Sequence, residues 1–266
     1  MSISPSSLSP SAIVARLRAA GCVFAEDEAR LLLSTAQTSD DLAAMVERRV
    51  AGLPLEHVLG WAQFCGLRIA VDPGVFVPRR RTEFLVQRAA ALAGEPTGAV
   101  VVDLCCGSGA LGVALAASLG RVELHAADID PAAVRCARRN LADVGGHAHE
   151  GDLYEPLPAT LLGRVDVLLA NVPYVPTGEV GLLPPEARVH EALVALDGGA
   201  DGLDVLRRVT AEASRWLAPG GHLLFETSER QVSQAVEIVT GDGLTATVAT
   251  SDELYATVVI GTRPAT

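Results

Sequence analysis

One short segment of the 266-residue chain could orient a planar nitrogen for reaction. Asn171, Val172, Pro173 and Tyr174 directly follow the apolar run 165–170. An amide nitrogen is a poor nucleophile because its lone pair is delocalised. The side-chain oxygen of Asn171 and the main-chain carbonyl of Val172 could accept both of its N–H bonds and turn the nitrogen toward a methyl group, with Tyr174 on its flat face. A plain Asx-turn explains Asn171 and Pro173 without chemistry, so both interpretations stay open.

A second segment has the composition of a nucleotide-binding turn. After Asp103 the chain reads Leu-Cys-Cys-Gly-Ser-Gly, so Gly107 and Gly109 stand where an apolar run passes into a helical pattern. Glycine lets the backbone approach a ligand closely, and a helix start offers free amide donors. Asp128 ends the next apolar run, where nucleotide-binding sheets place an acid on a ribose diol. Capping of a helix at Pro131 is the alternative role of Asp128.

The glycine turn predicts S-adenosylmethionine as the ligand rather than NAD. It lacks the G-x-G-x-x-G spacing, and no partner for hydride transfer stands out. The chain has no lysine, which excludes P-loop, Schiff-base and pyridoxal chemistry. We predict no metal site, because His147 and His149 fit an exposed strand and the five cysteines form no C-x-x-C pair.

A parallel sheet would bring these segments together. Apolar runs alternate with helical patterns in the second part of the chain, which predicts an α/β fold with a doubly wound, mostly parallel sheet. The ligand should then lie beyond the carboxyl ends of the central strands. We expect strands over 99–104, 122–128, 165–170, 222–227, 244–249 and 254–260, and helices over 110–119, 131–144, 203–217 and 231–240.

The first part of the chain predicts a small helical domain. Helical patterns lie between Ser9 and Gly21, over 25–35, and between Ser39 and Gly52. Short apolar stretches broken by glycine, aspartate and proline then predict a hairpin that joins two domains. We therefore divide the chain into a helical domain at 1–60, a hairpin linker at 61–77, and a cofactor-binding domain at 78–266.

Composition narrows the function classes. The net charge of −11 argues against broad binding of nucleic acid phosphates, which depends on clustered basic side chains. No apolar run reaches the roughly 18 residues that a membrane span needs, so no membrane partner is expected. The N-terminus lacks the pattern of a secretory signal, and we predict a cytoplasmic protein.

The ordered set of segments resembles the HemK/PrmC-type protein-(glutamine-N5) methyltransferases over nearly the whole chain. The segments that carry the resemblance are GLPLEHVLGWAQFCGLRIAVDPGVFVPR, DLCCGSGALGVALA, ADIDPAAVRCARRN, GDLYEPLP, NVPY and GGADGLDVLRRV. That family uses S-adenosylmethionine to methylate the glutamine in the Gly-Gly-Gln loop of peptide-chain release factors. The resemblance implies a Rossmann-like class I methyltransferase, the same cofactor, and a protein substrate such as a release factor.

The resemblance also implies roles for individual residues. Those expected to bind the cofactor are Asp103, Cys105, Gly107, Gly109, Asp128, Ile129, Asp152, Leu153 and Asn171. Those expected to act on the amide are Asn171, Pro173 and Tyr174, and those expected to bind the acceptor are Arg79, Glu83, Asn171, Val172, Pro173 and Tyr174.

Several positions depart from the family pattern and suggest a diverged paralogue. Arg80 and Arg81 stand where the family has proline and an acid, and Val172 replaces the first proline of N-P-P-Y. Ala192 and Ser228 also replace usual residues. These changes leave the methyl acceptor open, and the run of three arginines is either a solvated linker or a basic patch that attracts an acidic acceptor.

Three other functions compete with glutamine methylation. Adenine-N6 methyltransferases of nucleic acids share N-P-P-Y, but the acidity of this chain and the lack of a target-recognition insertion argue against that acceptor. A small-molecule N-methyltransferase is a further alternative. An inactive cofactor-binding protein that acts through its N-terminal helices is disfavoured because Asn171, Pro173 and Tyr174 are intact.

Overall fold

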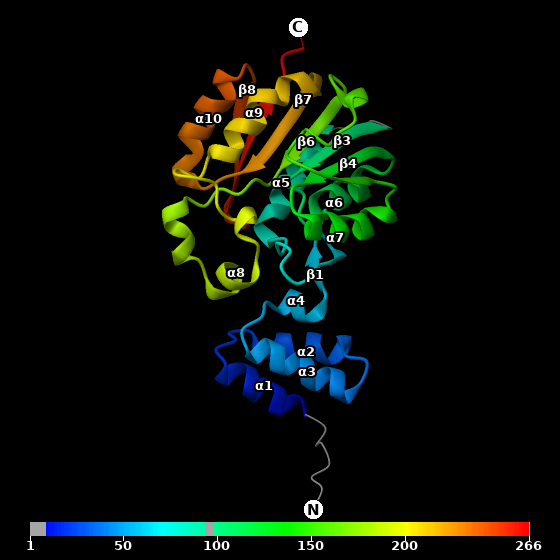
Figure 1. Cartoon of the computed structure of the whole chain (residues 1–266), viewed down its shortest axis with the longest axis vertical. Helices are drawn as coiled ribbons and strands as arrows, with labels where there is room; N and C mark the ends of the chain where they lie inside the picture. The colour runs from blue at the N-terminus through cyan, green and yellow to red at the C-terminus, as the bar shows by residue number, and fades with distance from the viewer. Residues whose placement is uncertain (1–8, 94–97, 266) are drawn as a thin grey trace, which may run out of the picture.

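A seven-stranded sheet forms the centre of the computed structural model, which describes residues 9–93 and 98–265 (Figure 1). Residues 1–8 lie outside this range. They include part of the N-terminus, for which the sequence predicts no secretory signal. The strand order is β5-β4-β3-β6-β7-β9-β8, and only β9 runs antiparallel to its neighbours. The strands are β3 Ala99–Leu104, β4 Val122–Asp128, β5 His147–Glu150, β6 Val165–Ala170, β7 Leu217–Glu226, β8 Thr245–Ser251 and β9 Ala256–Thr262.

The chain winds outward from the middle of the sheet in two directions. It builds β3, adds β4 and β5 on one side, and then crosses over to place β6 on the other side of β3. All six residues of β3 are buried, as expected for a parallel strand covered on both faces. The predicted doubly wound, mostly parallel sheet is confirmed, and its switch point lies between β3 and β6.

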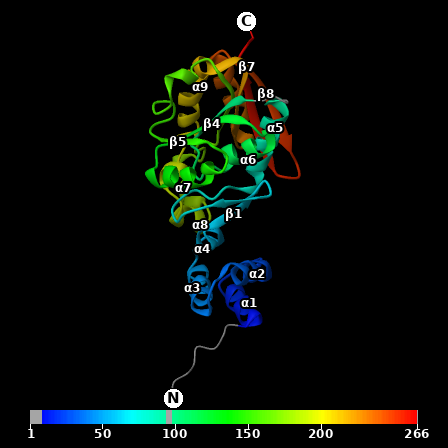
Figure 2. The ribbon, with the colours of Figure 1, turned by 90° about the vertical axis from the view of Figure 1, so that its right-hand side faces the viewer.

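Helices cover both faces of the sheet (Figures 1 and 2). One face is covered by α5 Glu83–Ala93, α6 Ala110–Leu119 and α7 Pro131–Ala142. The other is covered by α9 Asp204–Trp216 and α10 Val232–Gly241. No helix of the described residues is long and apolar enough to cross a membrane.

Some limits differ from the sequence-based prediction. The strand β7 begins at Leu217 rather than at residue 222, because buried Leu217 already pairs with Val165 across a register shift. The helix α5 was not predicted, since alanines on both of its faces weaken the amphipathic pattern around Leu85. Two short helices, α4 Leu55–Leu59 and α8 Pro185–His190, were not predicted either.

The N-terminal helices have a hydrophobic cluster of their own. The helices α1 Pro10–Ala19, α2 Ala25–Thr35 and α3 Ser39–Val50 bury side chains such as Leu17 and Leu32 between them. Figure 2 shows them at the end of the molecule opposite β8 and α9. The helix α4 comes next in the chain. It is followed by an antiparallel hairpin of β1 Trp61–Phe64 and β2 Leu67–Ala70, which confirms the predicted hairpin. The domain limits at residues 60 and 77 stay a prediction.

The packing of Gly109 yields a test of the fold. Its φ is +76°, and a Cβ added there would overlap Leu141 Cδ1 and press on Ala137. We expect Gly109→Ala to lower the free energy of unfolding by about 2–4 kcal/mol, because overpacking adds to the left-handed strain. Gly145→Ala is the control, since its φ is +68° with open space around it, and it should cost about 1 kcal/mol. Urea unfolding measures both, and equal losses would contradict tight packing at Gly109.

Candidate active site at the carboxyl edge of the sheet

A cavity of about 630 Å³ lies at the carboxyl ends of the central strands. Residues that follow four parallel strands line it: Cys105 after β3, Asp128 at the end of β4, Asn171 after β6, and Thr227 after β7. The linker before α5 and the segment that contains α8 complete its walls. The ligand-sized space therefore lies where a doubly wound sheet is expected to bind.

The glycine turn leaves β3 in a tight left-handed path. Cys105 and Gly107 have φ values of +53° and +54°, and the Gly109 amide donates to the Cys106 carbonyl at 2.7 Å. This geometry turns the chain into α6 while Cys105 and Gly107 line the cavity. Burial raises the pKa of the Cys105 thiol, so the thiol is not a ready nucleophile.

Asp103 lies behind this turn with one oxygen unused. Its side chain is buried, and Oδ2 accepts the Gly112 amide hydrogen at 3.0 Å. Oδ1 is buried and has no hydrogen-bond partner within the described residues. Burial, with a smaller effect of the Asp128 charge, raises the pKa of Asp103 to about 8. Asp103 and Gly109 are not among the residues that line the cavity.

Asp128 ties the end of β4 to the glycine turn. One carboxylate oxygen accepts the Gly107 amide at 2.8 Å, and the other accepts the Asp130 amide at 2.9 Å. Burial raises the pKa of Asp128, while these amide donors lower it. The helix α7 is capped instead by Asp130, which accepts from the Ala132 amide at 2.8 Å. The capping alternative for Asp128 is therefore wrong.

The remaining predicted cofactor residues come together around the same cavity. Asp152 is held by Arg208 on α9, whose Nη2 donates to its carboxylate at 2.6 Å. Leu153 follows with a φ of +49°, which turns the chain at the cavity edge. The predicted cofactor residues that line the cavity are Cys105, Gly107, Asp128, Ile129, Asp152, Leu153 and Asn171. Sequence reasoning missed Arg208, which lies 56 residues from its partner.

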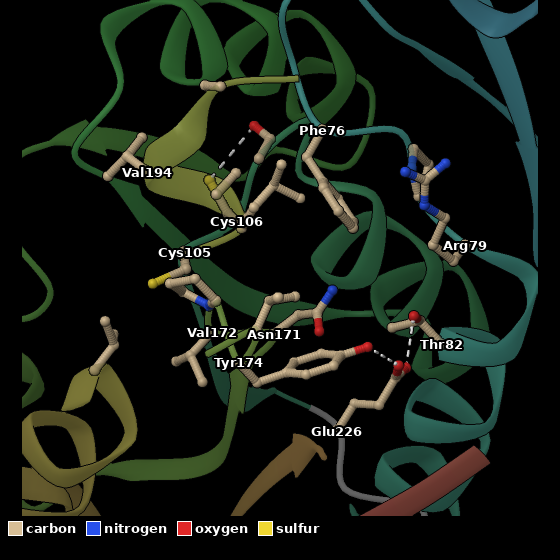
Figure 3. A pocket seen from close by; sticks show the side chains of 18 of the residues that line it. Phe76, Arg79, Thr82, Cys105, Cys106, Asn171, Val172, Tyr174, Val194 and Glu226 are labelled. Atoms are coloured by element: carbon tan, nitrogen blue, oxygen red, sulfur yellow. Dashed lines mark hydrogen bonds between the residues drawn. The ribbon is translucent and has the colours of Figure 1, made fainter. Parts of the chain in front are cut away.

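Asn171 lines the cavity next to Tyr174 and has an unused side-chain oxygen. Figure 3 shows its amide beside the ring of Tyr174, with Phe76 across from it. Its Oδ1 is buried and accepts no hydrogen bond from any described residue. An Asx-turn requires that oxygen to accept a nearby backbone N–H, so the turn-only interpretation of Asn171 is wrong. Sequence reasoning missed Phe76, which the linker supplies.

Tyr174 is fixed by a polar cluster at the far side of the cavity. Its hydroxyl donates to Glu226 Oε1 at 2.9 Å and accepts from the Arg81 guanidinium, and Thr82 donates to Glu226 Oε2 at 2.7 Å (Figure 3). Burial, with the charge of Glu226, raises the pKa of Tyr174, so the phenol stays neutral. Gln231 holds the Tyr174 carbonyl at 3.0 Å. Hydrogen bonds therefore fix both the hydroxyl and the main chain of Tyr174.

Two of the three consecutive arginines are paired with buried carboxylates. Arg79 contacts Glu191, whose side chain is 1% exposed, and Arg81 contacts Glu226 at 2.7 Å. Arg80 is exposed. Arg81 is also exposed, at 47% of its side chain, and both Arg79 and Arg81 line the cavity. The run is therefore partly ion-paired, and a role in attracting an acidic acceptor stays a prediction. Glu83, unlike Arg79, does not line the cavity. Its carboxylate accepts the Cys65 amide of the hairpin at 2.9 Å instead.

The sequence matches a known domain family and several curated proteins. The profile of the family described as methyltransferase small domain matches residues 66–242. The release factor glutamine methyltransferase of Gloeobacter violaceus is 39% identical, with 76% of this chain and 72% of that protein covered. The enzyme of the same description from Mycolicibacterium smegmatis is 39% identical, with 82% and 78% covered. A 4-amino-L-phenylalanine/4-methylamino-L-phenylalanine methyltransferase of Streptomyces pristinaespiralis is 36% identical, with 74% and 69% covered.

Solved structures share the fold at lower identity. A methyltransferase of Pyrococcus furiosus superposes with a TM-score of 0.56 at 16% identity, over 75% of this chain and 90% of that one. The T. thermophilus 16S rRNA N2 G1207 methyltransferase, in complex with AdoMet and guanosine, superposes with a TM-score of 0.55 at 19% identity, over 76% and 49%. These likenesses identify a Rossmann-like methyltransferase fold.

The contacts of Asp128 predict a loss of cofactor affinity. We expect Asp128→Ala to weaken S-adenosylhomocysteine binding roughly ten- to 150-fold, because charge-assisted hydrogen bonds contribute about 1.5–3 kcal/mol. Calorimetric titration measures this change. Asp143→Ala, at the exposed far end of α7, is the control and should bind as the wild type does. Unchanged affinity in Asp128→Ala would remove this carboxylate from the cofactor site.

The raised pKa of Asp103 predicts a pH-dependent stability difference. The folded protein keeps a proton on Asp103 between pH 4 and about 8 that the unfolded chain has released, so folding stability falls as pH rises through that window. Asp103→Asn lacks this proton. Its stability relative to wild type should therefore rise by up to about 1.4 kcal/mol per pH unit. Urea unfolding at pH 5, 6, 7 and 8 checks this, and a constant difference would show that Asp103 ionises normally.

Proposed function

The chain belongs to the release factor glutamine methyltransferase family, and we propose from this that its acceptor is a glutamine side chain of a peptide-chain release factor. It is an S-adenosylmethionine-dependent protein-(glutamine-N5) methyltransferase. The choice of a planar amide as the methyl acceptor is supported mainly by one observation: the side-chain oxygen of Asn171, beside Tyr174, is buried and has no hydrogen-bond partner among the described residues.

The residues around the glycine turn fit S-adenosylmethionine. Asp128 would hold the ribose diol, because carboxylate oxygens that each accept one amide still have free lone pairs. The Cys105–Gly107 turn lets the backbone approach the cofactor. Asp103 lies behind this turn and would support it through the Gly112 amide rather than contact the cofactor. When bound, the cofactor supplies a methyl group already activated on a sulfonium.

Asn171 and Val172 would orient the acceptor amide. Two acceptors are needed for two N–H bonds, and the Asn171 side-chain oxygen with the Val172 carbonyl supplies that number. Tyr174 would pack against the flat face of the amide, and Glu226 keeps the ring in place. Holding both N–H bonds directs the nitrogen toward the methyl carbon for in-line attack. Transfer would form the new N–C bond as the S–C bond breaks, with S-adenosylhomocysteine as the leaving group, and the methylated nitrogen would release one proton to solvent.

Two departures from the family pattern bear on the acceptor. In the family an acid stands where this chain has Arg81, but here Arg81 is compensated by buried Glu226. Val172, which replaces a proline of the family pattern, lies buried between Asn171 and Pro173. We propose that it keeps the family geometry, because the main-chain carbonyl that would hold the amide does not depend on the side chain. The cytoplasmic location and the absence of broad nucleic acid binding stay predictions.

A direct transfer assay tests the acceptor. The purified protein would be incubated with labelled S-adenosylmethionine and a bacterial release factor, and the methylated residue would be located by mass spectrometry. We expect label on the glutamine of the Gly-Gly-Gln loop and none on a release factor with that glutamine changed to alanine. Parallel incubations with 4-amino-L-phenylalanine and with adenine-containing DNA test the small-molecule and nucleic acid alternatives. Label in either of those and none in the release factor would overturn the proposal.

Asn171 should affect turnover rather than cofactor binding. We expect Asn171→Ala to lower kcat on the release factor by about a hundred- to a thousandfold, the scale for losing one oriented polar group, because one N–H bond of the amide is no longer held. S-adenosylhomocysteine affinity, measured on the same preparation, should change little. Full turnover in this variant would show that Asn171 does not orient the acceptor.

A further inference from the structure

One arginine of the N-terminal helices contacts the wall of the active-site cavity. Arg49, on α3, has a side chain that is only 10% exposed. Its guanidinium donates to both oxygens of Glu28 on α2, at 2.6 and 3.2 Å, and to the Leu53 carbonyl at 2.9 Å. Its Nη1 also donates at 2.6 Å to Glu186, which lies on α8 and lines the cavity. A single buried cation thus joins the helical bundle to the catalytic half of the molecule.

Glu186 belongs to a segment that lines the acceptor half of the cavity, by which we mean the part next to Asn171 and Tyr174. We call residues 176–196 the wall segment. It starts two residues after Tyr174, and its ends meet where the Val175 amide donates to the Leu196 carbonyl at 3.1 Å. Residues that line the cavity recur along it, among them Leu183, Ala187 and Val194. Its position therefore sets the shape of the space next to the catalytic Asn171–Tyr174 segment.

The wall segment has little hydrophobic anchoring of its own. Only Ala187, Glu191 and Leu196 are buried in this fully described stretch, while Leu182 is 82% exposed and Val189 63%. Segments with few buried apolar side chains open at low free energy, so their position depends on polar contacts. At its ends the segment is held by Thr177, which donates to Asp197 and Gly199. Between its ends, Glu191 and Ala192 bond to residues 74–79, and Glu186 bonds to Arg49. Of these contacts, the one between Glu186 and Arg49 joins the segment to the N-terminal helices.

We propose that Arg49 is a positioning residue for acceptor binding. Through Glu186 it holds the wall segment in place, and the N-terminal helices thereby shape the acceptor half of the cavity. Glu28 and Leu53 fix the guanidinium within the bundle, so the bundle presents it to Glu186 as a rigid donor. This inference rests on the proposed function for the identity of the acceptor, but not for the contact itself.

The position of the wall segment can be measured without any acceptor. Glu186→Gln keeps the size of the side chain and removes its charge, and it leaves Arg49 paired with Glu28 inside the bundle. We expect amide hydrogen exchange in peptides covering 183–196 to quicken about tenfold, because the Gln oxygen can accept only a weaker, uncharged hydrogen bond from Arg49 in place of the charge-assisted one. Glu47→Gln is the matched control, because Glu47 pairs with Arg16 on the same bundle at 2.7 Å. It should leave exchange in these peptides unchanged.

Kinetics on the release factor then test the effect on the acceptor. We expect Glu186→Gln to raise KM for the release factor about tenfold, with kcat and S-adenosylhomocysteine affinity unchanged. A direct contact of Glu186 with the acceptor is excluded by repeating the change in an Arg49→Gln background. If Glu186 acts through Arg49, the double variant has the KM of the single variants rather than the product of two effects.

Three results would overturn the proposal. They are unchanged exchange in Glu186→Gln, faster exchange without a rise in KM, and a Glu186→Gln effect that persists in full in the Arg49→Gln background. Arg49→Gln could fail to fold, because Glu28 is left buried and unpaired. In that case the hydrogen exchange and the KM of Glu186→Gln still test whether Glu186 positions the wall segment for acceptor binding. If the wild type methylates no release factor, the proposed function fails, while the exchange experiment still tests the contact between Arg49 and the wall segment.

Discussion

The register of β3 against its two neighbours is the constraint on which the site depends. Leu104 pairs with Ala127 of β4 on one side and with Ala170 of β6 on the other. The next residue of each strand is therefore at the same level of the sheet edge, and these residues are Cys105, Asp128 and Asn171. A slip of one residue in either pairing would turn every side chain of that strand to the other face. The residues proposed to bind the cofactor and the amide are thus aligned by one buried strand.

Sequence reasoning could find this alignment because each functional residue directly follows an apolar run. A buried parallel strand is a continuous apolar stretch, and its end marks the edge of the sheet. The same reasoning could not find the cluster of Arg81, Thr82 and Glu226 around Tyr174, because no local pattern relates residues separated by 52 to 145 positions. It also assigned Glu83 to the acceptor, whereas the hairpin turn uses that carboxylate.

The paired arginines show how this chain tolerates its departures from the family pattern. Arg81 replaces an acid, but it meets a carboxylate that is almost completely buried, and an unpaired charge there would be costly. Arg79 makes the same kind of contact with Glu191. Both cations are thus neutralised by buried carboxylates although their own side chains still line the cavity.

The contact between Tyr174 and Glu226 also bears on the order in which the enzyme matures during its synthesis. The two residues close a loop of 52 positions, and Glu226 lies at the end of β7. The N-terminal helices make contacts that are close in sequence, so they can form early, whereas pairing of distant parallel strands is slow. During synthesis Glu226 is added 52 residues after Tyr174, so the phenol ring has no carboxylate partner until β7 has been made. The Tyr174 hydroxyl can therefore be anchored to Glu226 only after β7 has been synthesised and has joined the sheet.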